Sequence, residues 1–450
     1  MTLSRRGFLA LSGVAALTPA LAACGGDARR TFDGIEYWAA FPDDAQREYF
    51  QAERVDAFTG SAPVQLTIKP SESIGRLVQT ALAAGAGPDL ISTAGPAQVA
   101  AYAGAGYLLP LDEYAQQYGW NGALAPWALA ASRMDGKLLS LPAGYESMIL
   151  LYNPATLATN GWSVPTNRAE FEAICTEAKA KDMIPVAAGN GDFRPASEWA
   201  VTFALNHHAG PTAVHEVLAG RIPWTDPVIV DAIAQLSDYF QRGWWGGSVE
   251  DYFTTGFPSM YASLASGEAV FMITGSWALS ELGPYFGEEA GNDATWDWAP
   301  LFPLRDDVPA QVWDLGIGQT MSINSKCPIP DAAAEYLDFL ETDPGRQAEG
   351  IAEVGLQPAP VRLTAADFPD SVDERQSRLY VELSNAATIG YTTWTFCPQQ
   401  TDTELYTNFD KVFTDLITPH EYCAGLDKIF RKELALGKVP AAPAPDGLAR

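Results

Sequence analysis

The chain is poor in basic residues, in histidine and in the short motifs that mark common catalytic sites. It has 28 Lys and Arg against 55 Asp and Glu, which gives a formal net charge of −27. This balance disfavours nucleic acid as a partner, because phosphates would be repelled, and it disfavours attraction to anionic lipid. The 4 histidines lack ligand-like partners, and there is no G-x-S-x-G, H-E-x-x-H or P-loop motif. We therefore expect no metal, no cofactor and no catalysis.

Cysteine is also scarce, with 5 residues in the chain and no C-x-x-C pair that would suggest a metal or redox site. Cys24 has a separate role, described next. The others can pair outside the cytoplasm, and Cys397 and Cys423 are the best candidates for a disulfide because they are nearest in sequence. Cys175 and Cys327 complete the set.

The N-terminal segment has the features of an export signal. Arg5-Arg6, followed by an apolar run too short to span a membrane, resembles a twin-arginine signal. The stretch Leu21 to Gly25 resembles a lipobox, which predicts cleavage before Cys24 and lipidation of its sulfur. We expect residues 1–23 to be removed and residues 24–31 to tether the protein to the outer face of the cell membrane. An ordinary cleaved signal with an incidental cysteine is the alternative.

The remaining chain is long enough for two or three hydrophobic cores, and it opens with an α/β pattern. Predicted strands at 34–38, 64–69 and 89–92 alternate with predicted helices at 44–59 and 73–84. Ligands of such sheets bind beyond the carboxyl ends of the strands. The residues expected there are Trp38, Phe41, Ser71 and Thr93.

The stretch from Leu139 to Pro154 predicts the passage from one lobe to another. Pro142 and Gly144 exclude a helix interior, and Met148 to Tyr152 is an apolar run of strand length. We expect an exposed turn followed by a buried strand. Tyr145 and Glu146 would then face a cleft at the crossing, where a hydroxylated ligand could bind.

Four blocks of sequence, taken in order, resemble the extracellular solute-binding proteins of carbohydrate ABC importers. They span residues 80–115, 134–157, 264–282 and 315–340. Their most specific parts are Gly87-Pro88-Asp89, Asp135-Gly136-Lys137, Tyr152-Asn153 and Gly275-Ser276-Trp277. Each match alone is weak, but the ordered set covers most of the chain. The chain is therefore identified as a member of this family.

The resemblance implies a two-lobed α/β fold of the type II periplasmic-binding-protein kind, with hinge crossings and a helical C-terminal portion. We expect residues 32–143 and 268–316 in lobe 1, and residues 144–267 and 317–438 in lobe 2. Residues 439–450 are Pro-rich and predict a disordered tail. The implied function is capture of a sugar or oligosaccharide by a monomer and its delivery to the ABC-type permease.

A sugar site needs aromatic planes for the C–H faces of the sugar, together with carboxylates and amides for its hydroxyl groups. The resemblance implies that Trp277 stacks on the sugar and that Glu146 binds it. Loop positions, strand ends and tryptophans supply the other candidates. The full predicted set is Trp38, Phe41, Asp43, Ser71, Thr93, Tyr145, Glu146, Asn190, Asp192, Trp199, Gly275, Ser276, Trp277, Trp313 and Trp394.

Two other functions fit parts of this pattern. An extracellular glycosidase also uses carboxylates in an aromatic cleft, but no paired-carboxylate motif can be identified. A binding protein for a cationic solute, such as a polyamine or betaine, would use an acidic aromatic site through cation–π contacts. The carbohydrate blocks favour the sugar.

Overall fold

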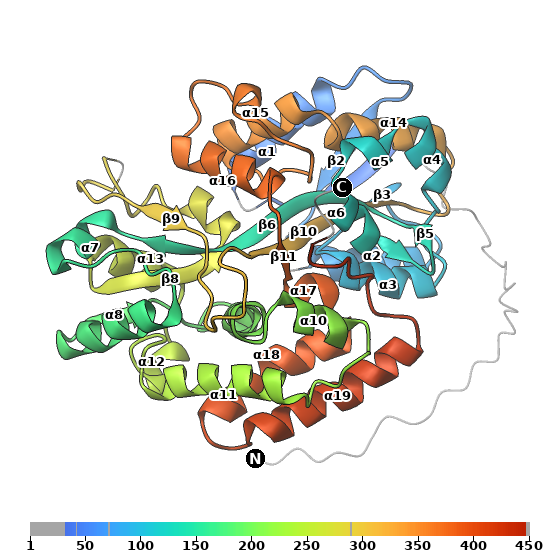
Figure 1. Cartoon of the computed structure of the whole chain (residues 1–450). Helices are drawn as coiled ribbons and strands as arrows, with labels where there is room; N and C mark the ends of the chain where they lie inside the picture. Colours follow the sequence, from blue (N-terminus) through green and yellow to red (C-terminus); the bar gives the residue numbers. More distant parts are fainter. Residues whose placement is uncertain (1–31, 42, 71–72, 289, 447–450) are drawn as a thin grey trace, which may run out of the picture.

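A single mixed β-sheet runs through the middle of the molecule (Figure 1). The computed structural model describes residues 32–41, 43–70, 73–288 and 290–446. Seven strands follow one another in the order β2-β1-β3-β10-β6-β8-β7, while β11 pairs with β10 and β9 pairs with β6. The strands are β1 (Ile35–Ala39), β2 (Val64–Ile68), β3 (Leu90–Thr93), β6 (Leu141–Tyr152), β7 (Ile184–Val186), β8 (Ala269–Gly275), β9 (Asp297–Ala299), β10 (Trp313–Ile323) and β11 (Ile389–Tyr391). A separate hairpin joins β4 (Arg133–Met134) to β5 (Lys137–Leu138).

One end of the sheet is a parallel set made by β1, β2 and β3. Parallel neighbours require crossover connections, and helices provide them here. As a result, the carboxyl ends of β1 and β3 lie at the same edge. The helices of this part are α1 (Asp44–Phe50), its π-helical continuation η1 (Gln51–Asp56), α2 (Ile74–Ala83), α3 (Pro96–Gly104), α4 (Asp112–Gln117), α5 (Trp120–Ala123) and α6 (Pro126–Ala131).

The strand β6 passes from one part of the sheet to the other. Leu141 to Ser147 pair with β10, and Met148 to Tyr152 pair with β8. The predicted crossing is thereby confirmed, but the strand is longer than expected. Tyr145 and Glu146 lie inside it and are buried, not in an exposed turn. Pro142 is tolerated within the strand, where it lies opposite Thr320 of β10.

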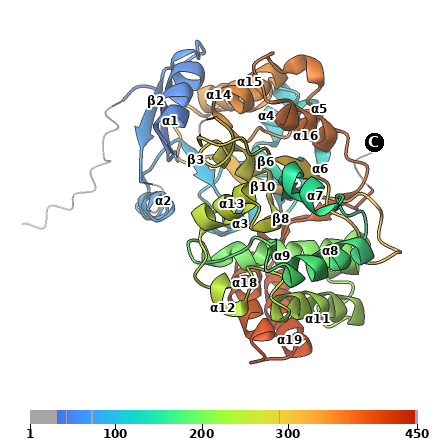
Figure 2. The same cartoon turned by 90° about the vertical axis from the view of Figure 1, so that its left-hand side faces the viewer.

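The strand β10 makes the second crossing in the opposite direction. Trp313 to Leu315 pair with β11, and Thr320 to Ile323 pair with β3. The helices α14 (Pro330–Glu341), α15 (Pro344–Val354) and α16 (Glu374–Ser384) follow, together with the 3₁₀ turn η5 (Ala365–Asp367). They lie on the side of α1, as Figures 1 and 2 both show.

The expected division into lobes does not match this pairing. β8 pairs with β7 and with the second half of β6, so it belongs with the segment 144–267 and not with 32–143. The helix α15 packs against α1, α16 packs against α15, and Tyr336 of α14 contacts Phe58, so these helices belong with 32–143. The buried apolar run of β8 fits a strand in either lobe, and its pattern could not show which sheet it joins.

The second part of the molecule consists mainly of helices (Figure 2). They are α7 (Pro154–Asn160), α8 (Arg168–Ala180), η2 (Arg194–Ala196), α9 (Ser197–Ala204), η3 (Leu205–Ala209), α10 (Pro211–Leu218), α11 (Pro227–Gln241), α12 (Val249–Tyr252), α13 (Phe257–Ser266), η4 (Ser276–Glu281), α17 (Thr393–Phe396), α18 (Gln399–Phe413) and α19 (Pro419–Ala435). The helix η4 follows β8 directly and returns toward the crossing.

The C-terminal segment is docked as far as Asp446, in contrast to the predicted tail. The Ile389 N–H donates to the carbonyl of Pro445 at 2.9 Å, and the Tyr391 hydroxyl donates to the carbonyl of Pro443 at 2.5 Å. These contacts place the segment along β11.

The predicted disulfide is wrong, because Cys397 and Cys423 are both free thiols. Cys397 follows α17, whereas Cys423 lies within α19. Each is buried, and burial raises the pKa of the Cys423 thiol to about 12. Both are therefore apolar packing residues, and closeness in sequence did not indicate a bridge.

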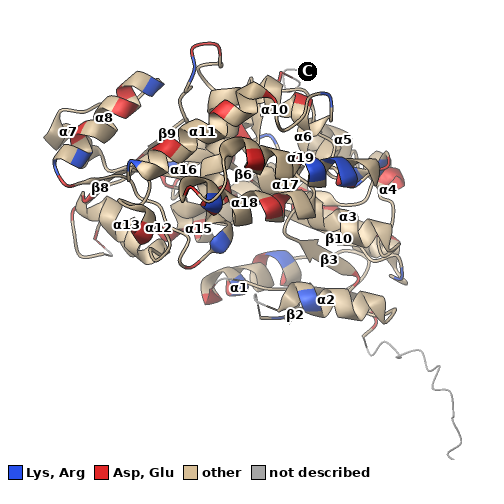
Figure 3. Ribbon diagram, turned by 90° about the horizontal axis from the view of Figure 1, so that it is seen from below, with Lys and Arg blue, Asp and Glu red and all other residues tan. Residues whose placement is uncertain are grey.

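Acidic and basic positions are interspersed along the helices visible in Figure 3. Within the described ranges, no helix is both long and apolar enough to cross a bilayer. The predicted lipidation site Cys24 and the export signal lie outside those ranges.

Candidate functional site

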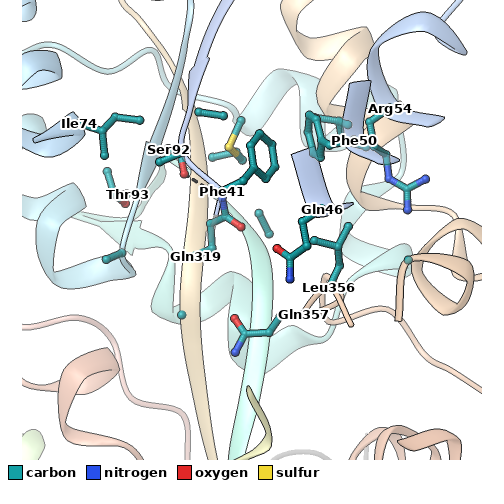
Figure 4. Close-up of a pocket in the computed structure, with 18 of the residues that line it drawn as sticks. Phe41, Gln46, Phe50, Arg54, Ile74, Ser92, Thr93, Gln319, Leu356 and Gln357 are labelled. Atoms are coloured by element: carbon teal, nitrogen blue, oxygen red, sulfur yellow. Dashed lines mark hydrogen bonds between the residues drawn. The ribbon is translucent and has the colours of Figure 1, made fainter. Parts of the chain in front are cut away.

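A cavity of about 690 Å³ lies beside the crossing strands, within the usual size range of small-molecule sites (Figure 4). Its walls come from the carboxyl ends of β1 and β3, from β6 and β10, from η4, and from the loop after α15. Three of the predicted site residues line it, namely Phe41, Thr93 and Trp277. Phe41 and Thr93, which were predicted from the strand-end rule, thus lie at the lining of this cavity.

Three glutamine side chains surround the same space, as Figure 4 shows for Gln46, Gln319 and Gln357. Each amide nitrogen donates into the protein: Gln319 to the Ser92 hydroxyl at 2.9 Å, Gln46 to the Val354 carbonyl at 3.2 Å, and Gln357 to Glu146 at 2.6 Å. No hydrogen bond from a described residue reaches the three amide oxygens. These oxygens can accept hydrogen bonds from the hydroxyl groups of a ligand.

Glu146 lies directly behind the cavity wall and does not line it. Its carboxylate accepts hydrogen bonds from the Trp394 indole at 2.7 Å and from Gln357 at 2.6 Å. A Cβ added at Gly318 would be 2.7 Å from this carboxylate, so glycine is needed for the close approach. Burial raises the pKa of Glu146 to about 7, and the two hydrogen bonds oppose that rise. In this geometry Glu146 positions Gln357 and Trp394.

Three predicted tryptophans meet beside the cavity. Trp277 is half-buried, and its ring lies 5.2 Å from the ring of Trp199 and 5.8 Å from that of Trp394, in the second case edge-to-face. A Cβ at Gly275 would overlap the Trp277 ring, so that glycine allows the indole to fold over the strand end. The cluster joins α9, η4 and α17, which are far apart in sequence. It presents one aromatic wall at the cavity, through Trp277.

Several predicted polar residues have structural roles instead. Asp43 is exposed and caps α1 by accepting the Gln46 N–H at 2.8 Å. Asp192 accepts the Phe257 N–H at 2.9 Å, at the start of α13. Ser276 accepts the Ser147 N–H at 3.3 Å and is buried. The amide nitrogen of Asn190 is buried without a partner among the described residues, away from the cavity lining.

Other predicted residues lie in the core or outside the described ranges. Tyr145 packs edge-to-face against Trp127 and Tyr380. Trp313 is 2% exposed and contacts Trp298. Trp38 is half-buried under the ammonium of Lys69, which lies 4.3 Å from its ring, and Ser71 falls in a segment that is not described.

Sequence reasoning missed all five glutamines that line the cavity, the three described above among them, and two buried ionisable residues there, Arg54 and Glu341. Gln357 follows Gly355, a glycine in the left-handed conformation that ends α15. A glycine at a helix end predicts the start of a loop there, but not that the loop lines a cavity. Arg54 and Glu341 lie within helical segments, where no local pattern distinguishes a cavity residue from a surface residue.

This arrangement of two sheet regions joined by long shared strands, with a cavity at the crossing, is the fold of two-lobed solute-binding proteins. The structure is similar to that of a chitin oligosaccharide binding protein, with a TM-score of 0.73, 18% identity, and coverage of 89% of this chain and 98% of that one. It is also similar to the sugar-binding protein MalE from Xanthomonas citri, with a TM-score of 0.69, 18% identity, and coverage of 89% and 97%. The predicted two-lobed α/β fold is confirmed.

The sequence leads to the same class. Residues 53–376 match the family described as bacterial extracellular solute-binding protein, and the chain belongs to that family. A curated relative is the alpha-glucosides-binding periplasmic protein AglE of Rhizobium meliloti (strain 1021), which is 25% identical over 306 residues. That match covers 63% of this chain and 64% of the relative, so it spans less than two thirds of the relative's length.

Proposed function

We propose that the protein captures a sugar or oligosaccharide outside the cytoplasm and delivers it to the permease of an ABC importer. The observation that carries this proposal is a cavity that combines aromatic side chains, Trp277 and Phe41 among them, with three amide oxygens available to hydroxyl groups. Aromatic planes and amide acceptors are the chemistry that sugars require. The ligands named for the similar proteins, which are alpha-glucosides and chitin oligosaccharides, support the same class.

The ligand is held by closure of two lobes. We assign β1 to β3, α1 to α6 and α14 to α16 to one lobe, and β7 to β9, β11, α7 to α13 and α17 to α19 to the other. The shared strands β6 and β10 and the connection from α16 to β11 form the hinge. Trp277 and Gln357 face the cavity from different lobes, so closure would bring both onto one ligand.

The protein acts as a lipid-anchored monomer, held at the outer face of the membrane through Cys24. A pair of lobes closed around a sugar gives the permease one surface to recognise. Solution scattering tests the motion, because saturating sugar should reduce the radius of gyration. An unchanged radius with binding proved by calorimetry contradicts closure.

A thermal-shift screen across sugars, polyols, polyamines and betaine tests the ligand class. A ligand at 100 times its Kd should add about 2.7 kcal/mol to the free energy of unfolding. Stabilisation by sugars alone supports the proposal, and stabilisation by the cations alone contradicts it. Incubation of the protein with the stabilising sugar, followed by product analysis, separates binding from hydrolysis, since a binding protein returns the sugar intact.

A further inference from the structure

The inner end of the cavity contains two buried ionisable side chains that the proposed sugar site does not use. Arg54 is 4% exposed and Glu341 is 6% exposed, yet both line the same cavity as Trp277 and Gln357. Figure 4 shows Arg54 beyond Phe50, on the side away from Ile74 and Thr93. The cavity therefore continues from the hinge into the space between α1, α14 and α15.

Arg54 is fixed from the helix side of this space. Its Nη2 donates to the Arg346 carbonyl at 2.6 Å, and its guanidinium lies 5.2 Å from the ring of Tyr49. A Cβ at Gly350 would be 3.0 Å from Nη2, so the absence of a side chain there leaves room for the guanidinium. The Arg346 carbonyl accepts from one of the five N–H donors of this arginine, which leaves other donors of a cavity-lining residue for a ligand.

Glu341 has no comparable contact to fix its side chain. It makes no hydrogen bond or ion pair with any residue in the described part of the chain, and Arg54 acts on it only by attraction at longer range. Burial raises the pKa of Glu341 to about 8. A buried carboxyl without a partner destabilises the folded protein, and the structure offers no compensating contact. A ligand group inside the cavity would supply the missing partner.

We propose that this inner end is a subsite for the terminal unit of an oligosaccharide, held by Glu341 and Arg54 through two neighbouring hydroxyl groups. The inference rests on the proposed sugar-binding function and narrows it. A hydroxyl group both donates and accepts, so one can bond to the carboxyl while the oxygen of the next accepts from the guanidinium. The ligand then extends past the glutamines to Trp277. A ligand of several sugar units would contact more of this lining than a single unit, so the preferred ligand is an oligosaccharide.

Calorimetric titration with chain-length series tests the subsite. The ligands are the α-1,4-glucan, chitin and xylan oligosaccharide series, each from one to four sugar units. The protein variants are Glu341→Leu and the conservative Glu341→Gln. In the wild type the affinity should rise steeply at the length that reaches Glu341. Glu341→Leu should weaken the longer ligands about tenfold and leave the monosaccharide unchanged, because one buried ligand hydrogen bond is lost. Glu341→Gln should retain most of the affinity, because the amide still donates and accepts.

The stability of the ligand-free variants separates a binding role from a structural one. Leucine has nearly the volume of glutamate and needs no polar partner, so Glu341→Leu should unfold at an equal or higher urea concentration than the wild type. A lower urea midpoint, with the length dependence preserved, overturns the subsite.

Trp277→Ala distinguishes failure of the inference from failure of the proposed function. If sugars bind and Trp277→Ala weakens every length equally, while Glu341→Leu has no effect on any length, the inner subsite is wrong and sugar binding stands. If no series binds to the wild type, the proposed function fails and the subsite fails with it.

Discussion

Replacing Glu146 with glutamine should change how the stability of the ligand-free protein depends on pH. The carboxyl is 5% exposed, and its pKa is raised from 4.5 to about 7, mainly by burial. Between these values the native protein holds a proton that the unfolded chain releases. The contribution of Glu146 to stability is therefore complete below pH 4.5 and is lost as the pH rises through 7.

The size of this stability loss follows from the difference between the two pKa values of Glu146, 4.5 in the unfolded chain and about 7 in the folded protein. A shift of one pKa unit corresponds to about 1.4 kcal/mol, so the full loss is about 3 kcal/mol. Within the window, one proton gives a slope of about 1.4 kcal/mol per pH unit. Glu341 and Asp402, with pKa values raised to about 8 and about 7, add slopes of the same sign in both proteins.

Urea unfolding at half-unit steps from pH 5 to pH 7, followed by tryptophan fluorescence and by circular dichroism, measures these slopes. Agreement of the two probes is required because a two-lobed protein need not unfold in one step. Glu146→Gln should lose stability with rising pH less steeply than the wild type, by about 1.4 kcal/mol per pH unit. The amide has one acceptor oxygen where the carboxylate has two, so the bond from Gln357 or the bond from Trp394 is lost, but that loss shifts the whole curve and adds nothing to the pH slope.

The control is Glu268→Gln, which removes one exposed carboxylate just before β8. It should follow the wild-type slope. Equal slopes for the wild type and Glu146→Gln would refute the reasoning, because they would mean that Glu146 is ionised in the native state throughout the window.

Three further predictions concern single positions. Trp277→Ala should weaken sugar binding by about 1.5 to 3 kcal/mol, seen by calorimetry, whereas Trp313→Ala should instead lower the free energy of unfolding by about 3 to 5 kcal/mol, because Trp313 is a core residue. Gly318→Ala should destabilise the protein by about 1 to 3 kcal/mol and weaken sugar binding, because the added Cβ meets the Glu146 carboxylate. An unchanged free energy of unfolding together with an unchanged affinity would contradict the close approach of Gly318 to Glu146. Cys24→Ser should move the protein from the membrane pellet to the soluble fraction, and retention after a salt wash contradicts lipidation.

The sequence predicted the elements well where local chemistry decides them. The helix predicted at 44–59 corresponds to α1 and its continuation η1, with Asp43 capping α1, and the helix predicted at 73–84 corresponds to α2. β1 to β3 lie within a residue or two of their predicted positions, because apolar runs bounded by turn residues determine them. The placement of β8 and the pairing of Cys397 with Cys423 were wrong, since both depend on which distant segments meet.

Prediction of the site residues from sequence has the same limit. Phe41 and Thr93 were predictable because they follow strands whose carboxyl ends meet at one edge. Gln357 and Glu341 contribute to the cavity only because α14 and α15 return to the side of α1 after the second crossing. No local pattern carries that information. Glu146 was predicted to contact the ligand, and its burial behind Gly318 is visible only once β6 and β10 are paired.

The docked C-terminal segment has a consequence for handling the protein. β11 is a short strand paired to β10 on one side, and the segment that ends at Asp446 occupies its other side through the Pro445 carbonyl. An uncovered strand edge is a template for pairing between molecules. Trimming the last dozen residues would bare that edge beside a crossing strand and favour aggregation through it. An affinity tag fused at the C-terminus should therefore leave the Pro443 and Pro445 contacts intact.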